Sequence, residues 1–175
     1  MNELNFRELV KRTHADWQVH NRDWTLPGFR AVVVCRFGQW RMTIKNAFLR
    51  APMSVMYRIL FRRVRNVYGI ELPYSITLGR EVVIEHQGAI VVHGSAVIGD
   101  GSIIRQGVTI GNRSLEHPYD APVIGAKVNI GAGAKILGKV TIGDGAVIGA
   151  NAVVLNDVGP RELAVGIPAR IVSKR

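Results

Sequence analysis

The sequence is short of cysteine, of long apolar runs and, over its first third, of acidic residues. Its one cysteine, Cys35, has no partner for an internal disulfide, and its apolar surroundings predict a core residue of a protein in the reducing cytoplasm. No apolar run approaches the roughly 18 residues that a membrane-spanning helix needs. The N-terminus also lacks a basic and apolar leader. We therefore expect neither a disulfide scaffold, nor a membrane-spanning protein, nor a secreted one.

The balance of basic and acidic residues divides the chain into two unlike regions. Residues 1–68 contain 13 Lys and Arg against 4 Asp and Glu, whereas residues 69–175 contain 10 against 9. The first part also holds 10 of the 12 aromatic residues but only 2 of the 19 glycines. This change of composition predicts a basic N-terminal region over 1–69 and a second domain over 70–175.

The first region is predicted to be helical. LNFRELVKRTHADW and APMSVMYRILFRRVRNVYG are compatible with helices. Pro27 and Pro52 predict breaks between helices, and Gly69 predicts a C-terminal stop.

A basic cluster lies on the last of these segments. It comprises Arg58, Arg62, Arg63 and Arg65. A solvated face is the ordinary interpretation, and contact with an anionic membrane surface or an acidic glycan is the functional alternative. Binding to nucleic acid is not expected, because no recognised nucleic-acid-binding motif accompanies the charge.

The second region repeats with a period of six residues. An aliphatic residue, usually followed by glycine, begins each hexad, and a small or β-branched residue occupies its fifth place. The aliphatic positions are Leu78, Ile84, Ile90, Ile98, Ile104, Ile110, Ile124, Ile130, Ile136, Ile142, Ile148 and Val154, with two extra residues before Ile98. This period fits short strands joined by tight turns, three to a coil. The predicted fold class is mainly β, a parallel β-helix of about four coils that follows a short helical region. The ladder is interrupted once, between Gly111 and Ile124, and such an insertion is a typical place for a functional site.

Over residues 70–172 the sequence resembles the hexapeptide acyltransferases, in their serine acetyltransferase-like branch. The resemblance rests on EHQGAIVVHGSAVIGDGSIIRQGVTIG, GAGAKILGKVTIG and GIPARIV. It implies a left-handed β-helix, an acetyl-CoA-dependent O-acetyltransferase and a homotrimer or a multiple of it.

Three departures from the family pattern bear on the acceptor. The family's Asp-His pair is Glu85-His86 here, and its Arg-His pair aligns with Asp120 and Ala121. The chain also ends at Arg175 without the family's isoleucine-terminated tail. These departures favour a sugar hydroxyl of an exopolysaccharide or cell-surface glycan over serine. Serine acetylation, another acyl acceptor and a non-enzymatic β-helix scaffold remain alternatives.

The resemblance also assigns candidate catalytic residues. His86 matches the family's general base, a role for which imidazole is well suited near neutral pH. Glu71, fifteen residues earlier, matches the acid that orients it. Glu85 is expected to line the acceptor pocket, and His117 is a possible substitute for the missing second histidine. His93 either contacts the acceptor or caps a turn.

The donor residues follow from the same resemblance. Ala132 and Ala150 match positions beside the pantetheine arm, and Lys135, Lys139 and Arg170 are available to the coenzyme's phosphates. No metal is expected, because the histidines lack a zinc-site spacing. Since glycan precursors are assembled on lipid carriers, the basic N-terminal region is further expected to contact the inner face of an anionic membrane.

Overall fold

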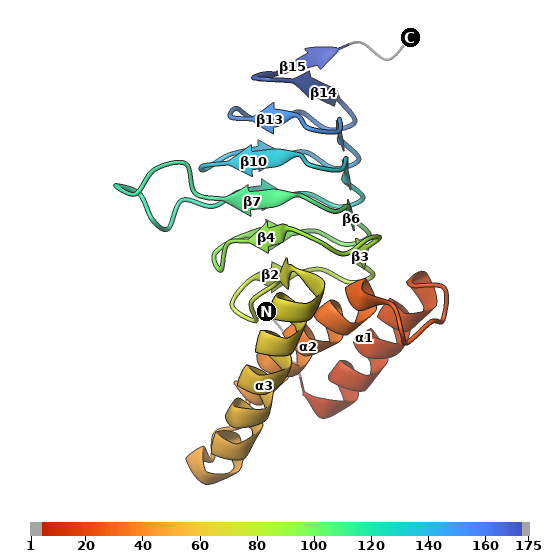
Figure 1. Ribbon diagram of the computed structural model, residues 1–175, viewed down its shortest axis with the longest axis vertical. Coiled ribbons are helices and arrows are strands. Elements are labelled where there is room, and N and C mark those ends of the chain that lie inside the picture. The colour runs from red at the N-terminus through yellow and green to blue at the C-terminus, as the bar shows by residue number, and fades with distance from the viewer. Residues whose placement is uncertain (1–4, 173–175) are drawn as a thin grey trace.

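The computed structural model describes residues 5–172, so Arg175 lies outside the described residues. This part of the chain forms three helices followed by fifteen short strands, and the helices lie at one end of a column of stacked strands (Figure 1). The helices are α1 (Phe6–Val19), α2 (Pro27–Arg41) and α3 (Ala47–Tyr68). The strands are β1 (Ile70–Glu71), β2 (Thr77–Leu78), β3 (Val83–Ile84), β4 (Ile90–Val92), β5 (Val97–Ile98), β6 (Ile103–Ile104), β7 (Thr109–Gly111), β8 (Val123–Ile124), β9 (Asn129–Ile130), β10 (Lys135–Leu137), β11 (Thr141–Ile142), β12 (Val147–Ile148), β13 (Val153–Val154), β14 (Leu163–Gly166) and β15 (Ala169–Val172).

The strands stack as three sheets in which every third strand is a neighbour. The orders are β1-β4-β7-β10-β13, β11-β8-β5-β2 and β15-β14-β12-β9-β6-β3. All pairs are parallel except β14 with β15. The hexad aliphatics, such as Ile98, Ile104 and Ile130, point inward and are completely buried. This arrangement confirms the predicted fold class, a parallel β-helix after a short helical region.

The strand register places the two extra residues of the hexad repeat at a corner other than the one that the sequence predicted. Val92, and not Ile90, pairs with Ile110 and so takes the repeat position. Since Ile84 pairs with Ile104, the corner between β3 and β4 is two residues longer than the corner above it. The hexad pattern had predicted the two extra residues just before Ile98, and this prediction was wrong. Both Ile90 and Val92 are buried, which is why the hexad pattern alone did not distinguish them.

The helix boundaries agree with the sequence at two of three places. Pro27 begins α2, and Gly69 ends α3 with φ 64°, a left-handed conformation that glycine adopts without a Cβ clash. Pro52, however, does not mark a break, because α3 runs through it from Ala47. Proline removes a single hydrogen bond near the exposed start of the helix, where water can satisfy the freed carbonyl.

A buried ion pair joins the helices to the first coil. Asp16 and Arg36 are 1% and 0% exposed, and the guanidinium of Arg36 binds both carboxylate oxygens of Asp16. The same guanidinium donates to the carbonyl of Gly79 at 2.7 Å. Beside it, Cys35 is buried, and burial raises the pKa of its thiol to about 12, so it is a core residue and not a nucleophile.

Candidate active site

His86 lies in the enlarged corner between β3 and β4. Its side chain is exposed, while Ile84 at the end of β3 is buried. The preceding Glu85 forms an ion pair with Arg105 of the next coil, 2.6 Å from carboxylate Oε2 to guanidinium Nε. Arg105 also donates to the Asn129 side chain one coil further. The corner is thus marked by two extra residues and by polar contacts that run from Glu85 through Arg105 to Asn129.

Gln106 and then two small residues follow His86 along the same corner. The register runs from Ile84 through β6, β9 and β12, so Gln106, Ala132 and Ala150 occupy the equivalent place in successive coils. Ala132 is half-buried and Ala150 is exposed, so two successive coils carry only a methyl side chain at this place. The structure therefore places two of the predicted donor-site residues in line with the predicted base.

Glu71 is half-buried on β1. This strand pairs with β4, the strand that follows the His86 corner. Within residues 5–172 no hydrogen bond joins the Glu71 carboxylate to the His86 imidazole. The Glu71–His86 dyad remains a prediction.

A cavity of about 350 Å³ lies where the loop between β7 and β8 leaves the β-helix. The loop projects from the side of the column (Figure 1). Arg113, His117 and Asp120 of the loop line this cavity together with Lys139. His117 was predicted from the sequence as an acceptor-site residue and Lys139 as a residue for the coenzyme's phosphates, whereas Arg113 was not predicted. Ala121 is 9% exposed and packs into the core, so it presents no polar group here.

The remaining predicted residues lie elsewhere. His93 caps a turn, because its Nδ1 accepts a hydrogen bond from the Ser95 amide at 3.2 Å. The Lys135 ammonium donates to the carbonyl of Gly107, and Arg170 is exposed on β15 in the last coil. Among the described residues, no three His, Cys, Asp or Glu side chains form a group that could hold a metal ion.

Sequence reasoning missed Arg105, although a signal was present. Most hexads carry glycine directly after the aliphatic residue, but IEHQGA and IRQGVT carry Glu85 and Arg105 there. Opposite charges at the same place in two successive coils predict a pair, provided that the coil length is known. The register supplied that length.

The fold and the repeats define the class as a parallel β-helix of hexapeptide repeats. The family described as bacterial transferase hexapeptide (six repeats) matches residues 121–156. Solved structures agree over nearly the whole chain. A serine acetyltransferase from Brucella abortus superposes with a TM-score of 0.82 at 28% identity, covering 97% of this chain and 70% of that one. Soybean serine acetyltransferase gives a TM-score of 0.77 at 32% identity, covering 94% of this chain and 69% of that one.

The chain belongs to the hexapeptide-repeat transferase family, and its homologues there are serine acetyltransferases with a left-handed β-helix. The Synechococcus elongatus serine acetyltransferase is 35% identical over 83% of this chain and 57% of its own length. The Salmonella typhimurium enzyme is 39% identical over 85% of this chain and 52% of its own. The chain thus spans little more than half the length of these curated relatives.

These relatives correct the expectation of a glycan acceptor, which was wrong. Homologues that are 35–39% identical over most of the chain are serine acetyltransferases. The prediction of a glycan acceptor relied on Asp120 and Ala121, which align with the family's Arg and His. That alignment assumed that the loop has the same local conformation as in the family. The cavity beside the loop is lined by two cations, Arg113 of the loop and Lys139 of the corner between β10 and β11.

Proposed function

We propose that this chain is a serine O-acetyltransferase, which transfers the acetyl group of acetyl-CoA to the serine hydroxyl. The observation that carries the proposal is His86 in the enlarged corner, in line with Ala132 and Ala150, in a chain whose homologues are serine acetyltransferases.

In this mechanism His86 removes the proton of the serine hydroxyl as its oxygen attacks the thioester carbonyl. The C–S bond then breaks, and the imidazolium returns the proton to the departing thiolate. The carboxylate of Glu71 orients the imidazole and stabilises its charged form. The ion pair of Glu85 with Arg105 fixes the side chain next to the base.

The donor and acceptor sites are proposed from shape and charge. The pantetheine arm follows the corner past Ala132 and Ala150, while Lys135 and Arg170 supply positive charge along the upper coils. Serine carries both a carboxylate and an ammonium group. The cavity at the β7–β8 loop offers Arg113 and Lys139 for the first and Asp120 for the second.

The experiment is thiol release from acetyl-CoA by the purified chain, with serine and with alanine offered separately. Alanine lacks only the hydroxyl, so it controls for hydrolysis of the thioester. Thiol release that depends on serine, with O-acetylserine as the product, supports the proposal. Equal release with serine and alanine contradicts it.

We also propose that the active species is a trimer or a multiple of it. His86 lies at the corner between β3 and β4, whereas the cavity is lined by the loop between β7 and β8 and by the corner between β10 and β11. A rotated copy can bring the loop of one subunit against the His86 corner of the next, and closed cyclic association does this three times. The site is incomplete within one chain.

Sedimentation velocity at micromolar concentration is expected to give a mass of three chains or a multiple of three. A monomer that retains full activity would show that one chain builds the whole site. A monomer without activity would leave serine acetylation to be tested at higher concentration, but it would exclude a stable trimer.

The basic N-terminal region supports a proposal of its own. Residues 24–70 contain eight arginines, one lysine and no acidic residue. On α3, Arg58, Arg62 and Arg63 are exposed, and no ion pair with them occurs within residues 5–172. The same helix exposes Phe48 (89%) and Ile59 (62%). None of the three described helices combines the length and apolar character that a bilayer-spanning helix requires.

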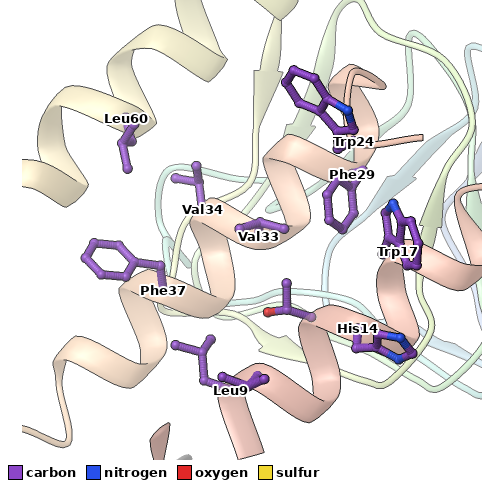
Figure 2. A pocket seen from close by; sticks show the side chains of 11 residues that line it. Leu9, His14, Trp17, Trp24, Phe29, Val33, Val34, Phe37 and Leu60 are labelled. Atoms are coloured by element: carbon purple, nitrogen blue, oxygen red, sulfur yellow. The ribbon is translucent and has the colours of Figure 1, made fainter. Parts of the chain in front are cut away.

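An apolar groove of about 580 Å³ lies beside this basic helix. Figure 2 shows Trp17, Trp24, Phe29 and Phe37 along it, with Leu60 of α3 at its side. We propose that α3 and this groove contact an anionic bilayer surface. A second copy of the same face would bring like charges together, whereas anionic lipids match the arginines and accept the apolar side chains.

Co-sedimentation with phosphatidylglycerol vesicles is expected at low salt, with loss of binding at high salt. Each Arg near an anionic surface contributes about 1 kcal/mol, so a triple Arg58→Gln, Arg62→Gln and Arg63→Gln variant should bind at least tenfold more weakly. The matched control is Arg80→Gln, an exposed arginine of the β-helix. Equal binding to phosphatidylcholine vesicles, or no binding to either, contradicts the proposal.

A further inference from the structure

The lower edge of the first coil is covered by side chains of the helical region. β3 is the terminal strand of its sheet, so its outer edge faces α2 and His20 at the end of α1. His20, which caps the C-terminus of α1, is 2% exposed, and its Nδ1 lies 2.6 Å from the carbonyl oxygen of Asp16. Its Nε2 lies 3.3 Å from the backbone nitrogen of Ile84. Because the carbonyl can only accept, Nδ1 carries the hydrogen and Nε2 accepts from the Ile84 amide.

Ile84 is therefore fixed immediately before the corner that carries His86. Its amide donates to His20, and its carbonyl lies against α2, where a Cβ added to Gly28 would be 2.0 Å from that oxygen. The next amide, that of Glu85, donates to the carbonyl of Ile104 at 3.0 Å. The chain then turns through Gly88 with φ 107°.

The His86 side chain has no hydrogen bond to another group within residues 5–172. Its position thus depends on the backbone of the corner. That backbone is held at its start by two bonds, from the Ile84 amide to His20 on the helical side and from the Glu85 amide to Ile104 on the side of the next coil.

We propose that His20 is a positioning residue for His86, because it holds the β3 end of the corner through the Ile84 amide. This inference rests on the proposed function, in which His86 is the base. The charged groups next to His20 are Asp16 of α1 and, bound to Asp16, Arg36 of α2. Burial lowers the pKa of His20 from its ordinary value, and the nearby Asp16 only partly opposes this effect. The imidazole is therefore neutral at pH 7 and keeps its acceptor.

The test compares His20→Gln with His20→Met. Both side chains have a similar shape, but only glutamine offers an acceptor to the Ile84 amide. Loss of the anchor displaces His86, and misplacements of the order of 1 Å lower rates by about a hundredfold. We expect kcat of His20→Met to fall about ten- to a hundredfold below that of His20→Gln, with the KM for acetyl-CoA unchanged.

Gln39→Met is the matched control, because Gln39 donates to the carbonyl of Ile76 in the same coil but away from the His86 corner. It should lower Tm without lowering kcat. Equal kcat values for His20→Gln and His20→Met, or the same loss of kcat in Gln39→Met, overturn the inference. A wild-type chain that does not acetylate serine overturns the proposed function instead.

Amide hydrogen exchange decides the case in which a variant does not fold. In the wild-type chain, protection of the Ile84 amide is expected to fall on acidification, after correction for the intrinsic exchange rate, because the imidazolium has no acceptor. The Glu85 amide, which is bonded to Ile104, serves as the internal control and should remain protected. Parallel loss of protection at both amides contradicts the anchor.

Discussion

Replacing His86 with alanine is expected to lower kcat for serine acetylation by about 10²–10⁴-fold, the usual contribution of a general base. The KM for acetyl-CoA should remain unchanged, because the base acts on the acceptor hydroxyl in the transition state and not on the bound donor. Glu71→Gln should have a milder effect, since it removes the orienting charge but leaves the base in place. Steady-state kinetics with both substrates varied measures these effects.

Gln87→Ala is the control for this experiment, because Gln87 is an exposed neighbour of His86 in the same corner. Its kcat should remain near that of the wild-type chain. If His86→Ala keeps more than about a tenth of the wild-type rate, its loss is smaller than a general base contributes, and His86 is not the base.

Replacing Arg36 with methionine is expected to have the largest effect on stability. Arg36 and Asp16 are both buried, so the change leaves the Asp16 carboxylate in the interior without its partner. Breaking a buried ion pair in this way costs about 3–5 kcal/mol. The variant also loses the hydrogen bond to Gly79 that ties α2 to the first coil. Urea unfolding at fixed protein concentration measures the change.

Two further variants show whether the cost comes from the unpaired charge. The double variant Asp16→Leu with Arg36→Met should be more stable than Arg36→Met alone, because no charge is then buried unpaired. Arg80→Met breaks the exposed pair with Asp100, whose side chains are 69% and 48% exposed, and it should cost about 1 kcal/mol or less. Similar losses of the free energy of unfolding for Arg36→Met and Arg80→Met would show that the buried pair contributes no more to stability than the exposed pair.

The prediction of the acceptor shows where comparison of single aligned residues with a family pattern fails. The aligned positions Asp120 and Ala121 lack the family's Arg and His, and this argued against serine. The cavity nevertheless contains Arg113 and Lys139 as cations. An irregular loop can present a charge from several backbone positions, so the absence of Arg and His at two aligned positions is weak evidence about the acceptor.

The sequence by itself determined the β-helix, the helical region before it and the stop at Gly69. Each is encoded locally: the hexads repeat the same inward aliphatic residue many times, and glycine at a helix end needs no distant partner. Only the tertiary structure decided that the longer corner is the one that carries His86, because this depends on pairing Val92 with Ile110 in the next coil. It also decided the contacts of Arg105 with Glu85 and of His20 with Ile84. These join residues 20 and 64 positions apart, and such contacts exist only once the coil length and the packing of α1 are fixed.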